Sequence, residues 1–180
     1  MNLSSYLSPI DVDSLGLVKN PEDPHLLFNM VDFYSQGEPK LDNAQIAILG
    51  VPEARNAFNN PNTNIAPDEI RQQFYQLYAW NKSVHIIDLG NIQIGKEIED
   101  TYEVLSEILA NLINQGIIPI ILGGSNDLAY ANYRAYEKLE KLVNIVAIDA
   151  RFDLGSENLP LRSNAYLNKI VLRQPNFLLN

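Results

Sequence analysis

The sequence contains no cysteine and only two histidines, His25 and His85. The lack of cysteine excludes disulfide bonds, thiolate zinc sites and a cysteine nucleophile. Neither histidine has a second imidazole at ligand spacing, so we interpret both as structural or surface residues. A metal site built from several histidines is therefore not expected.

Basic residues are also scarce, because 13 Lys and Arg stand against 22 Asp and Glu and give a net charge of −9. Nucleic acid and anionic membranes attract surplus positive charge, so we expect neither as a partner. No apolar run reaches the roughly 18 residues of a membrane span. Residues 1–13 lack the features of a secretory signal. We predict a cytoplasmic protein.

What the sequence does have is typical of a globular domain, since 46% of its 180 residues are apolar. We divide it into an irregular amino-terminal segment, residues 1–43, and an α/β region, residues 44–180. Within the first segment the pattern over 26–34 predicts a short helix. Prolines break up the rest of that segment, at positions Pro9, Pro21, Pro24 and Pro39.

The second region alternates short apolar runs with amphipathic segments. The runs predict strands over residues 45–50, 85–90, 117–122 and 144–149. The amphipathic segments predict helices over residues 67–78, 100–115 and 127–142, with Asp100 and Glu103 at capping-box spacing. This order implies a mainly parallel sheet with helices on both faces and with its chemistry at the carboxyl ends of the strands.

Two acids after the fourth predicted strand are the first candidates for chemistry. Asp149 and Asp153 could share a divalent cation, and an extended backbone would place Arg151 on the same face. A guanidinium between two carboxylates would neutralise them, so the alternative is an internal Asp–Arg–Asp ion cluster. The residues alone favour the ion cluster.

A Gly–Gly turn after the third predicted strand is the second candidate. Such a turn before a helix can hold an anion, but the phosphate-binding glycine motifs are absent. The favoured alternative is that Ser125 or Asn126 caps the following helix. Asp88, at the end of another predicted strand, is expected to cap a loop.

Four separated segments lie within residues 44–155: Gly50-Val51-Pro52, Ala66-Pro67-Asp68-Glu69-Ile70-Arg71, Asp88-Leu89-Gly90-Asn91, and Leu122-Gly123-Gly124 followed by Asp149-Ala150-Arg151-Phe152-Asp153. In their order and spacing they resemble the ureohydrolases, the superfamily of arginase, agmatinase and formimidoylglutamase. Within that superfamily the sequence resembles the bacterial formimidoylglutamase-like members.

The resemblance implies a three-layer α/β/α fold and a pair of Mn²⁺ ions that generate a hydroxide for C–N bond hydrolysis. Asp149 and Asp153 stand where the family has aspartate ligands, whereas Asn126 and Arg151 stand where it has histidine ligands. An amide is a poor Mn²⁺ ligand, and a guanidinium offers no lone pair and adds a positive charge. We therefore expect weak or absent Mn²⁺ binding.

The resemblance also implies further ligands beyond residue 180, so we expect a fold that is incomplete at its carboxyl end. The apolar run 176–180 is interpreted as the start of another strand. An unpaired sheet edge would favour a homo-oligomer. Three functions stay open: a non-catalytic relative of the family, an active hydrolase within a longer parent chain, and a module that binds a small guanidino or formimino ligand.

Overall fold

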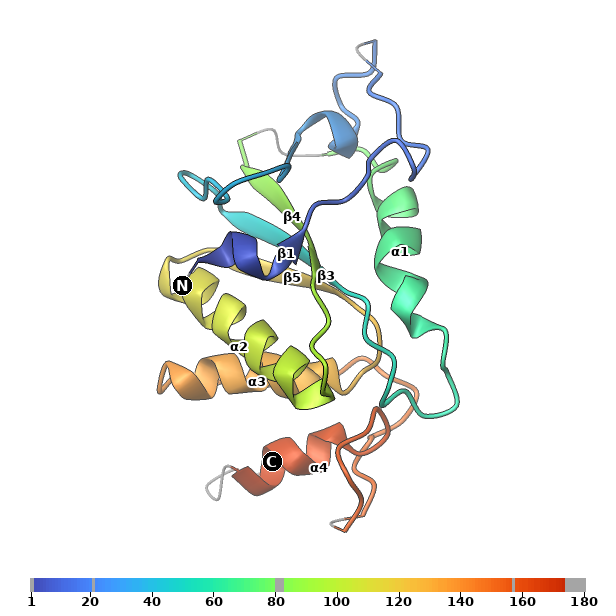
Figure 1. Ribbon diagram of the computed structural model, residues 1–180, viewed down its shortest axis with the longest axis vertical. Coiled ribbons are helices and arrows are strands. Elements are labelled where there is room, and N and C mark those ends of the chain that lie inside the picture. The colour runs from blue at the N-terminus through green and yellow to red at the C-terminus, as the bar shows by residue number, and fades with distance from the viewer. Residues whose placement is uncertain (1, 21, 80–82, 157, 174–180) are drawn as a thin grey trace.

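The computed structural model describes residues 2–20, 22–79, 83–156 and 158–173 (Figure 1). The strands are β1 (Leu7–Ser8), β2 (Val31–Phe33), β3 (Ile46–Val51), β4 (Ile86–Ile92) and β5 (Ile118–Gly123). The α-helices are α1 (Ala66–Phe74), α2 (Ile98–Asn114), α3 (Leu128–Lys138) and α4 (Tyr166–Arg173). Short 3₁₀-helices cover Leu3–Ser5, Leu27–Asn29 and Thr63–Ile65.

The five strands form one sheet, in which four strands follow the order β1-β4-β3-β5. The fifth strand, β2, pairs with the first half of β4, whereas β1 pairs with the last residues of β4. β2, β3, β4 and β5 are parallel, and β1 is antiparallel to β4. Parallel pairing brings the carboxyl ends of β3 and β5 to the same edge of the sheet, where the candidate site lies.

Helices cover both faces of this sheet. α1 lies on one face, and α2 and α3 lie on the other (Figure 1). Ala47 and Leu49 of β3 pack into the core beside α2, whereas the intervening Ile48 packs into the core beside α1. This two-sided burial explains why β3 is apolar throughout. The predicted three-layer α/β/α class is confirmed.

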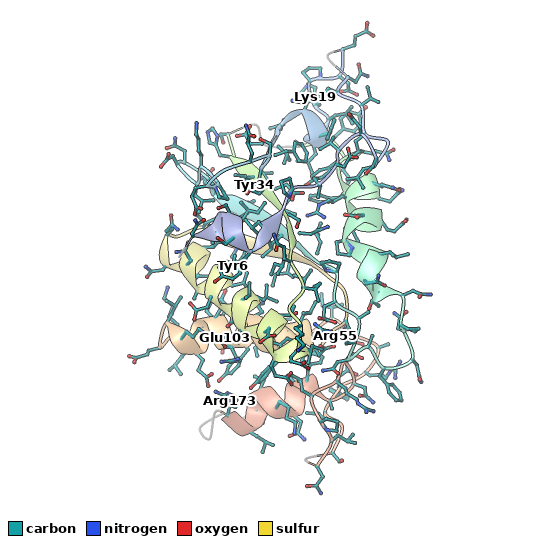
Figure 2. All side chains as sticks on the ribbon, in the orientation of Figure 1. Tyr6, Lys19, Tyr34, Arg55, Glu103 and Arg173 are labelled. Carbon is teal, nitrogen blue, oxygen red and sulfur yellow. The ribbon has the colours of Figure 1, made fainter. Side chains whose placement is uncertain are left out.

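The fourth helix is held against the third by charged side chains. Arg173 at the end of α4, labelled in Figure 2, donates from Nη2 to Glu137 of α3 at 2.7 Å. Its guanidinium also lies 5.9 Å from the centre of the Tyr130 ring. These contacts fix α4 over α3 and thereby position the loop that precedes α4.

Several local predictions need correction. Residues 144–149 form no strand, and Val146 and Ile148 are 87% and 100% exposed. An apolar strand needs a pairing partner and cover on both faces, and the described residues provide neither for this segment. The helix predicted within 26–34 is a 3₁₀ turn followed by β2. The strand start predicted at 176–180 lies outside the described residues.

The amino-terminal cap of α2 also differs from the prediction. The helix begins two residues before Asp100, and the Glu97 backbone N–H donates to the Asp100 carboxylate at 3.0 Å. The capping box therefore joins Glu97 and Asp100 rather than Asp100 and Glu103.

No helix in the described part of the chain is long and apolar enough to span a membrane. The cytoplasmic location and the lack of nucleic-acid or membrane partners stay predictions.

Candidate functional site

A polar cavity of about 140 Å³ lies at the carboxyl edge of β3 and β5. Three parts of the chain form its walls: residues 57–63 before α1, residues 124–126 before α3, and residues 149–153 and 163–164 before α4. The structure brings all four sequence-derived site residues to this cavity, namely Asn126, Asp149, Arg151 and Asp153.

The Asp149 carboxylate is the centre of the contacts in this cavity. The Asn126 side-chain amide donates to its Oδ2 atom at 3.0 Å, and the Arg151 backbone N–H donates to its Oδ1 atom at 3.1 Å. Burial raises the pKa of the neighbouring Asp153, and the negative charge of Asp149 raises it further. The two acids are therefore close enough to oppose each other's ionisation.

The predicted Asp–Arg–Asp ion cluster is wrong. No carboxylate in the described ranges lies within ion-pair distance of the Arg151 guanidinium. The prediction assumed an extended backbone, but Asp153 has a φ of 48° and the chain bends at Arg151. Alternate side chains consequently do not share one face.

These residues do not fit the manganese pair that the resemblance implies. Within the residues the structure describes, no group of three or more His, Asp or Glu side chains could hold a metal ion. The amide of Asn126 uses its N–H group, a donor rather than a ligand atom, toward Asp149.

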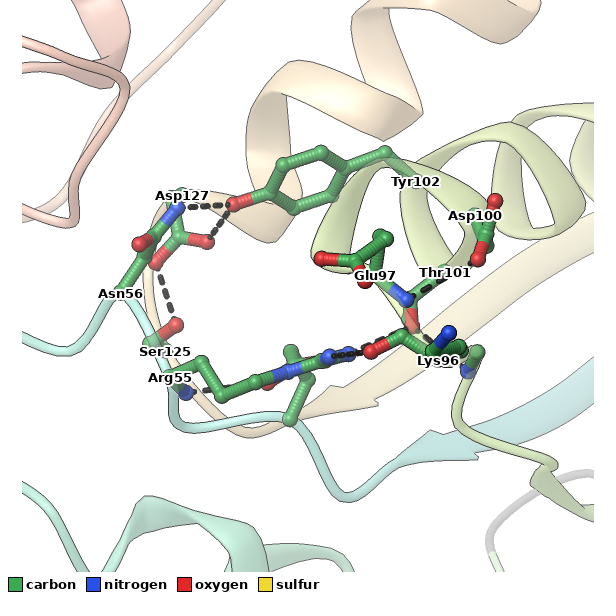
Figure 3. A network of polar contacts seen from close by, with 11 residues as sticks. Arg55, Asn56, Lys96, Glu97, Asp100, Thr101, Tyr102, Ser125 and Asp127 are labelled. Carbon is green, nitrogen blue, oxygen red and sulfur yellow. Dashed lines mark hydrogen bonds and ion pairs between the residues drawn. The ribbon is translucent and has the colours of Figure 1, made fainter.

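The predicted helix cap is also wrong. α3 begins after Asp127, and neither Ser125 nor Asn126 caps it with a side chain. The Ser125 hydroxyl donates to the buried Asp127 carboxylate instead. Tyr102 of α2 donates its hydroxyl to the same carboxylate (Figure 3). The Gly–Gly turn is therefore held by the buried Asp127 carboxylate rather than by a side chain that caps α3.

A second buried acid, Glu53, lies beside this turn and was missed by the sequence analysis. Its carboxylate accepts hydrogen bonds from Arg55 Nε at 3.0 and 3.1 Å. Its backbone carbonyl accepts the Ser125 N–H at 3.0 Å, and a Cβ on Gly124 would fall 2.0 Å from that oxygen. A carboxylate at the end of a buried strand is the signal that could have found it.

Arg55 connects this acid to the start of α2. Its guanidinium donates to the Lys96 carbonyl at 2.8 Å and to the Thr101 hydroxyl at 3.2 Å (Figure 3). Burial alone would raise the pKa of Glu53, but the hydrogen bonds and positive charge of Arg55 outweigh burial and lower that pKa. The pair therefore stabilises the fold while Glu53 is ionised.

We expect Arg55→Met to lower the free energy of unfolding at pH 7 by about 1–2 kcal/mol. The expected loss is smaller than for a fully buried ion pair, because solvent screens the partly exposed guanidinium of Arg55. Because the folded-state pKa of Glu53 is lowered, its contribution is present above about pH 4 and is lost as the pH falls further. Urea unfolding should show that Arg55→Met lowers the free energy of unfolding less at pH 3 than at pH 7. A loss of equal size at both pH values would contradict the role of charge.

A buried arginine joins three of the sequence motifs on the other face of the sheet. Arg71 of α1 donates from Nε and Nη2 to the Asp88 carboxylate at 2.8 and 3.0 Å, and both side chains are fully buried. Arg71 also donates to Asn91 Oδ1 at 2.6 Å, and Tyr75 donates its hydroxyl to Asp88. A Cβ on Gly50 would fall 1.8 Å from that Asn91 oxygen.

Asp88 therefore does more than the predicted loop cap. It accepts the Gly90 N–H at 2.8 Å, as a loop cap would, and it also balances the charge of Arg71. Arg71, Asp88 and Asn91 therefore stabilise the fold that carries the site, and none of them lines the cavity.

Comparison with known proteins agrees with this architecture. The profile of the Arginase family matches residues 44–173, which is more than half of the sequence. The chain belongs to the arginase family.

Individual relatives point the same way. A formimidoylglutamase from Hahella chejuensis is 30% identical over 124 residues, which is 64% of this chain and 38% of that protein. The solved formimidoylglutamase of Bacillus subtilis has a TM-score of 0.72 and 18% identity, covering 91% of this chain and 55% of its own. The Trypanosoma cruzi formiminoglutamase with Mn²⁺ has a TM-score of 0.69 and 21% identity, and the match covers 86% of this chain and 54% of that protein. This chain spans about half or less of each relative.

Proposed function

We propose that this chain is a non-catalytic, formimidoylglutamase-like member of the arginase family that does not hold a manganese pair by itself. The observation that supports this is the surroundings of Asp149. N–H donors of Asn126 and Arg151 occupy its two oxygens, and a permanently charged guanidinium lines the same cavity. Both features oppose the binding of two dications.

Titration calorimetry with Mn²⁺ tests this proposal. We expect no saturable binding at micromolar concentrations, and the Asp149→Asn/Asp153→Asn variant should give the same heats as the wild type. Two equivalents bound at micromolar affinity, and lost in that variant, would overturn the proposal.

Enzyme assays separate this function from that of an active hydrolase. We expect no formamide or ammonia from N-formiminoglutamate and no urea from arginine or agmatine. Metal-dependent turnover of any of these compounds would instead support the hydrolase that the sequence analysis left open.

One observation favours a second function, the binding of a small guanidinium or amine without hydrolysis. The Arg151 guanidinium forms no ion pair in the described ranges, so an external guanidinium or amine needs to displace only the N–H donors of Asn126 and Arg151 to reach Asp149 beside Asp153. Agmatine and methylguanidinium should then raise the melting temperature of the wild type. They should have no such effect on Asp149→Asn/Asp153→Asn, and an equal effect on both proteins would exclude this site.

A further inference from the structure

A single buried hydroxyl contacts residues next to two walls of the polar cavity. Tyr102 of α2 is 3% exposed, and its ring packs in the hydrophobic core. Its hydroxyl accepts a hydrogen bond from the Asn56 side-chain amide at 2.9 Å and donates one to the Asp127 carboxylate (Figure 3). Asn56 directly precedes the first wall, residues 57–63, and Asp127 directly follows the second wall, residues 124–126. Tyr102 therefore connects these two walls without lining the cavity itself.

The second wall is held by the buried Asp127 carboxylate. This carboxylate also accepts the Ser125 hydroxyl, and both residues are buried. The Ser125 backbone N–H donates to the Glu53 carbonyl at 3.0 Å, which joins the turn to the chain just after β3. The next residue, Asn126, carries the side-chain amide that contacts Asp149. The position of this turn therefore decides where that amide lies in the cavity.

The first wall is joined to the third wall, residues 149–153 and 163–164, through Asn56. The Asn56 backbone carbonyl accepts the Ser163 N–H at 3.1 Å. The Ser163 hydroxyl in turn accepts the Phe58 N–H at 2.8 Å. Because the Asn56 side chain is bound to the Tyr102 hydroxyl, that hydroxyl orients the backbone that holds Ser163.

Tyrosine suits these two contacts chemically. A phenol carries one donor hydrogen and acceptor lone pairs on the same oxygen, so it can donate to a carboxylate while it accepts from an amide. Burial raises the pKa of Tyr102, and the negative charge of Asp127 raises it further, so the hydroxyl remains a donor at neutral pH. Tyr102 and Asp127 are already buried by the described part of the chain, so these contacts need no further cover.

We propose that Tyr102 is the positioning residue of the cavity, because its hydroxyl holds all three walls in one arrangement. Walls that are fixed before a ligand arrives lower the cost of ordering them when it binds. The inference concerns the protein without a ligand. It is therefore independent of whether the cavity takes Mn²⁺ or a guanidinium.

Hydrogen exchange of single backbone amides, measured by NMR on the ligand-free protein at pH 7, tests this role. Tyr102→Phe removes the hydroxyl and keeps the ring. It should accelerate exchange at Ser125 and Ser163 by about tenfold or more, because a hydrogen bond to a charged group is lost. Tyr75→Phe is the matched control, because Tyr75 is also buried and donates to a buried acid, Asp88, on the other face of the sheet. Both variants should accelerate the slow amides of β3, which report global unfolding, but the control should change the two wall amides by less than about twofold.

Asn56→Ala separates the two connections. It removes the amide donor and leaves the other hydrogen bond of Tyr102, so exchange should accelerate at Ser163 and not at Ser125. Equal acceleration of the wall amides in Tyr102→Phe and Tyr75→Phe would show that the hydroxyl only stabilises the fold, and it would overturn the proposal. Unchanged exchange at Ser163 in Asn56→Ala would overturn it too, even if Tyr102→Phe failed to fold. Neither outcome bears on the binding of Mn²⁺ or guanidinium, which calorimetry and melting temperatures measure separately.

Discussion

Arg71→Met is expected to lower the free energy of unfolding by about 3–5 kcal/mol, the cost of leaving a buried charge without its partner. Arg71 and Asp88 are both fully buried, and the guanidinium makes two hydrogen bonds to the carboxylate. Methionine fills part of the space of the side chain but supplies no donor to Asp88, Asn91 or the Gly90 carbonyl. The destabilisation therefore comes from uncompensated polar atoms as well as from the lost ion pair.

Urea unfolding of two single variants and their combination measures this effect. Arg71→Met and Asp88→Asn each disrupt a buried pair, so each should destabilise the protein strongly. The double variant should lose less than the sum of the two, because it leaves neither charge buried without a partner.

Arg134→Met is the control for this experiment, because Arg134 pairs with Glu103 on the surface between α2 and α3. A surface pair contributes about 0–1 kcal/mol, so this variant should unfold almost like the wild type. If Arg71→Met cost no more than Arg134→Met, the buried network would not stabilise the fold.

The part of the fold that the sequence predicts well is the part with a local signal. β3 is buried on both faces and appears in the sequence as a continuous apolar run, and β4 and β5 lie within two residues of the strands predicted over 85–90 and 117–122. α2 repeats its apolar residues at helical spacing and is correctly placed apart from its first turn. For both kinds of element, residues close together in the sequence indicate which side chains are buried.

The Arg71 network has no such local signal. Its partners Asp88 and Asn91 are 17 and 20 residues away in the sequence. The family resemblance selected the segments that contain these residues, but their spacing does not show which side chains meet. The need for glycine at position 50 becomes clear only when Asn91 is seen beside it.

The errors at the candidate site have the same origin. The chain bends at Arg151 and has a left-handed backbone at Asp153, and apolar periodicity reveals neither feature. The segment 144–149 has the composition of a strand, but a strand also needs a partner and cover from distant parts of the structure. Sequence placed the candidate residues at one edge of the sheet and could not supply their orientations.

Asn126→His combined with Arg151→His is expected to raise the affinity for Mn²⁺ at least tenfold over the wild type. The change replaces an amide by an imidazole ligand and removes a permanent positive charge from the cavity. It also removes the amide donor that now contacts Asp149 Oδ2, which frees that oxygen for a metal ion. Calorimetry at pH 8, where imidazoles are neutral, measures the change.

The variant Asn126→Gln/Arg151→Gln separates the two causes, because it removes the charge without adding imidazoles. If ligand type decides the affinity, the histidine variant should bind Mn²⁺ and the glutamine variant should not. If the charge of Arg151 is the main obstacle, both variants should bind more tightly than the wild type, and the histidine variant more tightly than the glutamine variant. Unchanged affinity in both would show that Asp149 and Asp153 do not converge on one metal position, since neither charge nor ligand type would then limit binding.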